Sequence, residues 1–292
     1  MFDGFEARDL ATERGTIHAR VGGAGPPLLL LHGYPQTHLM WHACAPLLAQ
    51  HFTVVAADLS GYGDSFRPAP TADHLPHSKR ALALDQVQAM ASLGFDRFAV
   101  AGHDRGGRVA YRMALDHPER VSALAVLDIV PTAEVWARAD DRLALGYWHW
   151  GFLAQPAPLP ERLNAGDADA YFDYHLLMIG LGTDPEAYPD EVMAAYRRQL
   201  DDVSAVNAIC EDYRAAASID LEHDAADAQQ KLAMPLLALW GARGVVGQLY
   251  NVLETWRAKA TNVSGQSLDC GHVPQEERPA ETAQALIDFL TA

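Results

Sequence analysis

The chain has 292 residues, of which 22 are Lys or Arg and 38 are Asp or Glu, so its formal net charge is −16. A hydrophobic fraction of 49% with 21% charged residues is typical of a globular protein with a buried core, and it excludes a disordered chain. The acidic balance argues against nucleic acid and against a membrane surface as partners, because both are bound through basic faces.

Short apolar segments alternate with helical patterns through the first part of the chain. Strands are predicted at 27–32, 52–58, 98–102 and 121–127, and helices at 38–50, 78–93 and 106–116. The strands show no polar alternation, which is typical of a parallel sheet covered on both faces. Strand–helix–strand repeats with short connections predict an α/β fold with a mostly parallel, doubly wound sheet.

The segment 131–219 differs, because it contains many aromatic residues and helix formers but no convincing strand. The strand pattern resumes at 235–240, followed by a last short strand at 266–269 and a closing helix at 279–290. We therefore predict a core made of residues 1–130 and 220–292, with residues 131–219 inserted as a helical cap.

Signals for targeting and for disulfides are absent from the sequence. The first 20 residues lack a basic segment followed by an apolar one, and no apolar run approaches the ~18 residues that a membrane span needs. Cys44, Cys210 and Cys270 lie far apart and form neither a disulfide framework nor a metal-binding pair. We expect a cytoplasmic protein with reduced thiols and no membrane association.

The most specific motif runs from Gly102 to Gly107 (GHDRGG), between a predicted strand and a predicted helix. A nucleophile flanked by small residues at this spacing is typical of a nucleophile elbow, where a sharp turn puts the nucleophile at a helix N-terminus. Here the central residue is Asp104, and no Gly-x-Ser-x-Gly occurs elsewhere, which counts against a serine esterase. The alternative is a plain glycine-rich turn with Asp104 as the helix N-cap.

Two further segments support the elbow. His32-Gly33-Tyr34-Pro35 follows the first apolar strand, where this kind of fold supplies an oxyanion-hole donor, so the backbone N–H groups of Tyr34 and Arg105 are the predicted pair. His272 follows the last strand, as expected for a base in the chain order nucleophile, acid, histidine.

The predicted acid is Asp128. The loop 241–245, which follows the strand at 235–240, contains no carboxylate, whereas Asp128 ends the apolar strand 121–127. An ionisable group at that place needs a partner to be tolerated, which His272 would provide. A role as a loop or capping residue is the alternative for Asp128.

An aspartate nucleophile attacks saturated carbon and forms an alkyl ester, which activated water then hydrolyses, so alkyl halides or epoxides are the expected substrates. Arg105 and Arg108 lie about one helical turn apart beside Asp104 and suit a carboxylate. The alternative, a solvated basic helix start, fits poorly because helix N-termini disfavour cations.

Candidate donors to a departing halide come from the predicted cap. His149 and Trp150 carry ring N–H groups, and Tyr213 carries a hydroxyl. Core packing is the alternative for each of these three residues.

At these residues the chain resembles the haloacetate dehalogenase family (fluoroacetate dehalogenases) of the α/β-hydrolase superfamily. The shared blocks include HDRGGR at 103–108, LAVLDIVPT at 124–132, YWHWGFLAQPAPLPE at 147–161 and CEDYRAAASIDLEHD at 210–224. The resemblance implies an α/β-hydrolase fold, the same roles for the residues named above, no cofactor or metal, a small anionic haloacid as substrate, and a homodimer. The chain departs from the common family pattern at Met178-Ile179-Gly180, where a Trp is frequent, and at Val273-Pro274, where an aromatic residue is frequent.

Two other functions remain open on the sequence. An epoxide hydrolase shares the aspartate nucleophile and the HGxP loop, but gains nothing from a carboxylate clamp. A non-catalytic ligand receptor on the same fold would be expected to have a broken triad, whereas Asp104, Asp128 and His272 are all present.

Overall fold

A computed structural model describes residues 1–138, 140–179 and 187–292. Its strands form one sheet in the order β1-β2-β4-β3-β5-β6-β7-β8, in which β2 runs antiparallel to β1 and β4 and all other neighbours are parallel. The strands are β1 (Glu6–Ala11), β2 (Thr16–Gly22), β3 (Pro27–Leu31), β4 (Thr53–Ala57), β5 (Phe98–His103), β6 (Val121–Leu127), β7 (Leu236–Gly241) and β8 (Val263–Leu268). The predicted α/β fold with a mostly parallel sheet is confirmed.

The centre of the sheet is apolar and the edge that begins the chain is not. Every residue of β5 is buried, whereas Leu10 is the one buried residue of β1. Strands covered on both faces read as continuous apolar runs, which is why the central strands could be predicted. β1 and β2 were not predicted from the sequence, because β1 is a charged, exposed edge strand and β2 alternates buried with less buried residues, so neither contains a continuous apolar run.

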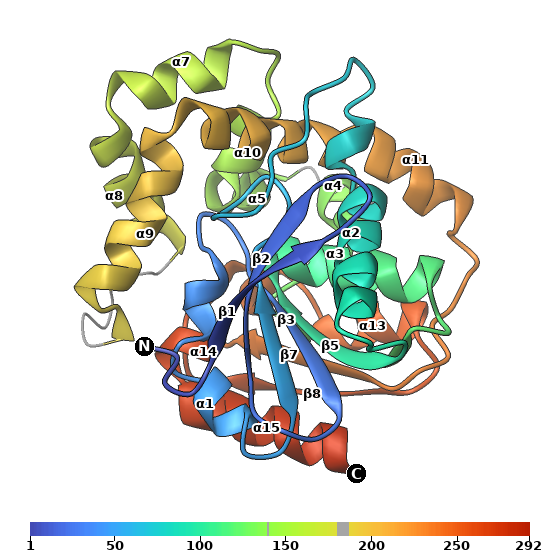
Figure 1. Cartoon of the computed structure of the whole chain (residues 1–292). Helices are drawn as coiled ribbons and strands as arrows, with labels where there is room; N and C mark the ends of the chain where they lie inside the picture. The colour runs from blue at the N-terminus through green and yellow to red at the C-terminus, as the bar shows by residue number, and fades with distance from the viewer. Residues whose placement is uncertain (139, 180–186) are drawn as a thin grey trace.

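Helices cover both faces of the sheet (Figure 1), with α2 and α3 on one face and α1 and α15 on the other. Those outside the β6–β7 connection are η1 (His38–Trp41), α1 (Ala45–Leu48), η2 (Leu75–His77), α2 (Lys79–Ser92), α3 (Asp104–Asp116), α12 (Val245–Leu249), α13 (Val252–Lys259), α14 (Pro274–Glu277) and α15 (Pro279–Thr291). The helix predicted at 38–50 is wrong as one element: η1 and α1 replace it, because Pro46 lacks the N–H donor that a continuous helix needs.

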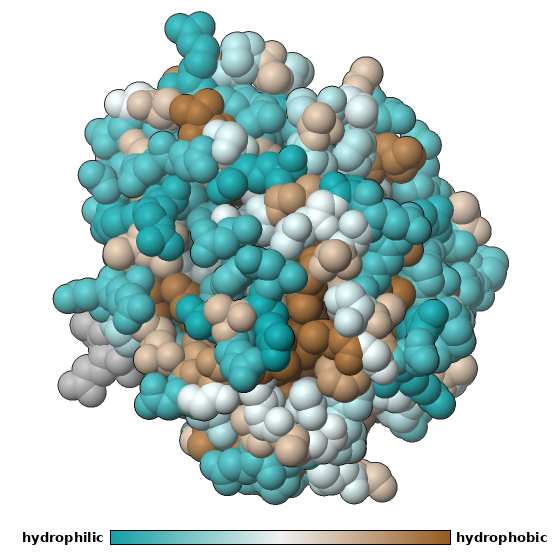
Figure 2. All heavy atoms as spheres, in the orientation of Figure 1, coloured by the Kyte–Doolittle hydropathy of each residue, from teal (hydrophilic) through white to brown (hydrophobic). Residues whose placement is uncertain are grey.

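Between β6 and β7 the described residues contain helices and no strand. They are α4 (Thr132–Ala137), α5 (Asp141–Gly146), α6 (Trp148–Leu153), α7 (Leu159–Gly166), α8 (Ala168–Ile179), α9 (Asp190–Asp201), α10 (Val203–Ala216) and α11 (Ile219–Ala226). In Figure 1, α7 to α10 gather beyond one end of the sheet. Hydrophilic residues cover most of the face shown in Figure 2, and hydrophobic ones gather near its centre.

Candidate active site

Asp104 lies at a sharp turn between β5 and α3. Its φ of 42° is in the left-handed region that non-glycine residues avoid, so the backbone is strained at this point. The glycines make the turn possible: a Cβ at Gly102 would lie 2.4 Å from the carbonyl oxygen of Gly106, and one at Gly106 would lie 2.3 Å from that of His32. This geometry is that of the predicted elbow.

The carboxylate of Asp104 is buried and accepts a backbone hydrogen bond. The N–H of Tyr34 donates to Oδ2 of Asp104 at 3.1 Å, so the predicted oxyanion-hole donor already contacts the predicted nucleophile. Burial alone would raise the pKa of Asp104, but His272 and Arg105 outweigh burial and hold that pKa well below its usual range. Asp104 is therefore ionised at neutral pH, as a nucleophile must be. Arg105 lies in the first turn of α3, where backbone N–H groups have no partner within the helix.

His272 and Asp128 form the pair expected from the sequence. Nδ1–H of His272 donates to Oδ2 of Asp128 at 2.5 Å, and the other carboxylate oxygen accepts the N–H of Gly241 at 2.9 Å. Burial would lower the pKa of His272, but the bond and charge of Asp128 and the charge of Asp104 raise it above its ordinary value. His272 therefore favours its protonated form while both carboxylates are ionised.

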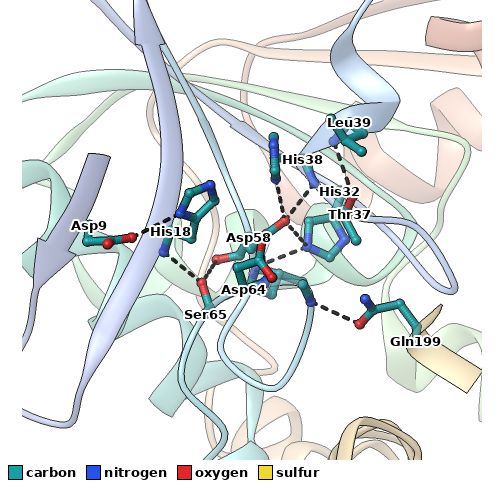
Figure 3. Close-up of polar contacts among 12 residues, drawn as sticks. Asp9, His18, His32, Thr37, His38, Leu39, Asp58, Asp64, Ser65 and Gln199 are labelled. Atoms are coloured by element: carbon teal, nitrogen blue, oxygen red, sulfur yellow. Dashed lines mark hydrogen bonds and ion pairs between the residues drawn. The ribbon is translucent and has the colours of Figure 1, made fainter. Parts of the chain in front are cut away.

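A polar cluster centred on Asp58 anchors the loop that carries Tyr34 (Figure 3). Asp58 follows β4, and its Oδ1 accepts the backbone N–H and the ring Nδ1–H of His38 at 2.7 and 2.9 Å. His32, the residue after β3, donates to the carbonyl of Gly33 and accepts the N–H of Leu59. These bonds fix the loop on both sides of Tyr34 and so fix where its N–H points.

Both predicted clamp arginines are buried near Asp104. Nε of Arg105 donates to Oδ2 of Asp212 at 2.7 Å, and Nη1 of Arg108 donates to the carbonyl of Val130 at 2.7 Å. Within the described part of the chain, Nη1 of Arg105 and Nε of Arg108 have no hydrogen-bond partner. Buried N–H groups without partners are costly, so these two are suited to an anionic ligand.

The predicted halide donors meet above these arginines. The ring centroid of Tyr213 lies 5.9 Å from those of His149 and Trp150, and the guanidinium carbons of Arg105 and Arg108 lie 4.1 Å from the Tyr213 ring and 4.5 Å from the Trp150 ring. The hydroxyl of Tyr213 and Nδ1 of His149 are buried without a partner among the described residues. Burial and His175 hold the pKa of His149 well below its ordinary value, so its ring is neutral.

Comparison with known proteins gives the family. The model of the α/β-hydrolase fold matches residues 26–279. The chain belongs to the α/β-hydrolase fold family. It is 44% identical over 291 residues to a fluoroacetate dehalogenase from Burkholderia sp, covering 100% of this chain and 95% of that one. The resemblance to haloacetate dehalogenases is thereby confirmed.

Two more relatives widen the comparison for this α/β hydrolase. A soluble epoxide hydrolase from Corynebacterium sp. (strain C12) is 32% identical over 278 residues, which cover 94% of this chain and 93% of the relative. The crystal structure of ALR0039 from Nostoc sp PCC 7120 matches with a TM-score of 0.97 and 52% identity, covering 100% of this chain and 99% of that one. Because these identities of 32% and 52% extend over nearly the whole chain, the proteins are similar in sequence as well as in fold.

Three residues of this site went unnoticed in the sequence. His175 of α8 is buried with its ring 4.6 Å from that of His149 and 4.9 Å from that of Tyr34. Asp212 holds Arg105 and also binds the ammonium of Lys79. Glu277 accepts hydrogen bonds on both sides of His272, from the N–H groups of Gly271 and Val273.

A sequence signal existed for one of the three. His175 follows Tyr171 by four residues, a spacing that puts both rings on one face of a helix. Gly180 of the departure at Met178-Ile179-Gly180, and the side chains of the two residues before it, lie outside the described residues.

Two further properties bear on partners. No helix in the described ranges is both long and apolar enough to cross a bilayer. Within the same ranges, no three His, Cys, Asp or Glu side chains are grouped so that they could hold a metal ion.

Proposed function

We propose that this hydrolase, which acts on carbon–halide bonds, converts a short 2-haloacid into the 2-hydroxy acid and halide. The substrate we favour is a haloacetate, fluoroacetate in particular, and the product is then glycolate. The observation that carries the proposal is the pair of buried guanidinium groups, each with an unpartnered N–H in the described part of the chain, beside a buried ionised aspartate. A carboxylate on the substrate would pair with both.

In the first step, an oxygen of Asp104 attacks C2 of the haloacid from the side opposite the halogen. The carbon–oxygen bond forms as the carbon–halogen bond breaks, and the halogen leaves with the bonding electrons as halide. Arg105 and Arg108 hold the substrate carboxylate and bring C2 into line with Asp104. His149, Trp150 and Tyr213 donate to the departing halide, whose charge develops in this step.

In the second step, His272 takes a proton from water, and the hydroxide attacks the ester carbonyl carbon of Asp104. The backbone N–H groups of Tyr34 and Arg105 stabilise the oxyanion. As it collapses, the leaving oxygen takes the proton from His272 and glycolate is released, and the carboxyl group of Asp104 then loses the proton of the added hydroxide to solvent. Ester formation removes the negative charge of Asp104, one of the charges that raise the pKa of His272. The imidazole therefore loses its proton more readily once the ester has formed, when a base is needed.

The first experiment measures halide release from fluoroacetate and chloroacetate by the parent protein and by Asp104→Asn. We expect both substrates to release halide and the substitution to abolish release. Asp96→Asn, at a carboxylate whose side chain is 89% exposed, is the matched control and should leave the rate unchanged. Release of chloride but not of fluoride would limit the enzyme to carbon–halogen bonds weaker than the carbon–fluorine bond. Release of no halide from either acid would contradict the proposal.

The second candidate is an epoxide hydrolase. The 32% identical relative of that name favours it, as does the buried hydroxyl of Tyr213, which could protonate an epoxide oxygen. It leaves the unpartnered N–H groups of Arg105 and Arg108 without a role. Turnover of styrene oxide without turnover of chloroacetate would favour this candidate.

We also propose that residues 131–219 act as a cap, and that the protein works as a homodimer in the cytoplasm. Support for the cap comes from hydrogen bonds that join this segment to the sheet region, such as Arg105 to Asp212 and Tyr196 to Glu276. Light scattering in solution tests the dimer, and a mass equal to one chain would contradict it.

A further inference from the structure

Glu277 binds the chain on both sides of His272. Its Oε2 accepts the N–H of Gly271 at 2.8 Å, and its Oε1 accepts the N–H of Val273 at 3.1 Å. The residue is 6% exposed, and the described residues provide no Lys or Arg partner for its carboxylate. A buried carboxylate is stable only when it is hydrogen-bonded or paired, so these two bonds matter to the fold as well as to the loop.

Capping of α14 accounts for only one of these bonds. Val273 precedes the first residue of that helix, and Glu277, the fourth helical residue, reaches back to its N–H much as the third residue does in a capping box. The N–H of Gly271 lies outside the helix and on the other side of His272. A side chain that served the helix alone would not need to reach it.

Two further hydrogen bonds hold His272 in place, one at its ring and one at its backbone carbonyl. Nδ1–H donates to Asp128, and the carbonyl oxygen of His272 accepts the ring Nε2–H of His103 at 2.8 Å. The backbone at residues 271–273 therefore has no freedom to rotate without breaking a hydrogen bond to Glu277, and that backbone decides where the imidazole points.

We propose that Glu277 is a positioning residue for His272, holding the imidazole where it activates water against the ester of Asp104. This inference rests on the proposed function, because it assigns Glu277 to the second step. That step transfers a proton from water to His272 and then from His272 to the departing hydroxyl oxygen of the product. The first step uses Asp104 and the clamp, and needs no proton transfer at His272.

The test compares the two steps in Glu277→Gln, with chloroacetate as substrate. An amide keeps one acceptor oxygen and turns an NH2 group toward the other N–H, so one of the two bonds is lost. We expect chloride release in the first turnover within about 3-fold of the parent, and ester hydrolysis slower by about 10–100-fold, as for a small misplacement of a base. Mass spectrometry of the quenched protein should then show a carboxymethyl ester that the parent does not accumulate.

Glu276→Gln is the matched control, because this neighbouring buried carboxylate binds the hydroxyl of Tyr196 and not the His272 loop. Burial raises the pKa of Glu276 to about 8, so an amide resembles the neutral form that this residue already populates. It should accumulate no ester. Glu277→Asp, which keeps the charge but cannot span both N–H groups, replaces the amide variant if that variant does not fold.

Three outcomes decide the matter. Ester accumulation in Glu277→Gln and not in Glu276→Gln supports the inference. Equal slowing of both steps, with no ester, overturns it and leaves Glu277 a purely structural residue. His272→Ala separates the two proposals: if it also accumulates no ester from chloroacetate, the aspartyl-ester function fails, and the role of Glu277 fails with it.

Discussion

The two sides of the site are built differently. On the sheet side, hydrogen bonds hold Asp104, Asp128 and His272 at 2.5–3.1 Å, and two of these residues, Asp104 and Asp128, have positive φ values of 42° and 51°. On the helical side, His149 and Tyr213 are held by ring contacts and keep buried polar atoms with no partner among the described residues.

This difference indicates a division of labour. Hydrogen bonds fix distances and angles closely, which suits groups that must attack or move a proton. Aromatic contacts tolerate small shifts, which suits side chains that would contact leaving groups of different size, as proposed for His149 and Tyr213. We therefore expect the sheet side to decide whether the reaction occurs, and the helical side to decide which halogen leaves.

The largest expected effect lies on the sheet side. Asp128→Asn removes the negative charge that favours protonated His272 and leaves one acceptor oxygen for the N–H groups of His272 and Gly241. Proton transfer by a positioned base contributes about 10²–10⁴-fold to rate. We expect steady-state turnover of chloroacetate to fall by that factor while chloride release in the first turnover persists. Rapid-quench kinetics measures both, and loss of the first turnover as well would place Asp128 in the alkylation step.

The next prediction concerns Arg105 of the proposed carboxylate clamp, whose bond to Asp212 joins the two sides of the site. Arg105→Lys keeps a positive charge but loses the fork that reaches both Asp212 and a ligand. A hydrogen bond to a charged group contributes about 1.5–3 kcal/mol, so kcat/KM for chloroacetate should fall by roughly 10–100-fold. Arg120→Lys, at a partly exposed guanidinium, is the control. An unchanged kcat/KM would remove Arg105 from substrate binding.

A smaller effect is expected on the helical side. Tyr213→Phe deletes the hydroxyl that has no partner among the described residues and leaves the ring in place. Fluoride concentrates its charge more than bromide does, so we expect defluorination to slow by about 10-fold and debromination by less. Tyr111→Phe, whose ring packs on Trp256 of α13, should change neither rate. Equal slowing for both halides would mean that Tyr213 does not bind the leaving group.

The smallest effect concerns pH. Asp104 is one of the charges that raise the pKa of His272 in the free enzyme, and formation of the proposed ester would remove that charge. Ester hydrolysis needs neutral His272, so its rate should rise with pH and reach half its maximum at a pH below the pKa of His272 in the free enzyme. NMR titration gives the pKa of His272 in the free enzyme, and the pH dependence of single-turnover kinetics gives its pKa in the ester intermediate. Equal values would show that the Asp104 charge does not act on His272.

Much of this architecture could be predicted from the sequence, for identifiable reasons. The central strands are apolar throughout, and the elbow needs glycine at Gly102 and Gly106 because backbone atoms would collide with any Cβ. Both features can be recognised from residues that are neighbours in the sequence. By contrast, Asp212 acquires its role from Arg105, 107 positions away, and Lys79, 133 positions away, and no local pattern reports such a pairing.

The bond between Arg105 and Asp212 also constrains how substrate arrives. Asp212 belongs to α10, so moving that helix away from the sheet would leave the fully buried guanidinium of Arg105 without its negatively charged partner. Breaking a buried ion pair costs about 3–5 kcal/mol, which would be incurred at every turnover if the helices swung open as a unit. We therefore expect the small acid to enter and the halide ion to leave between side chains that move locally, while α10 stays in contact with the sheet region.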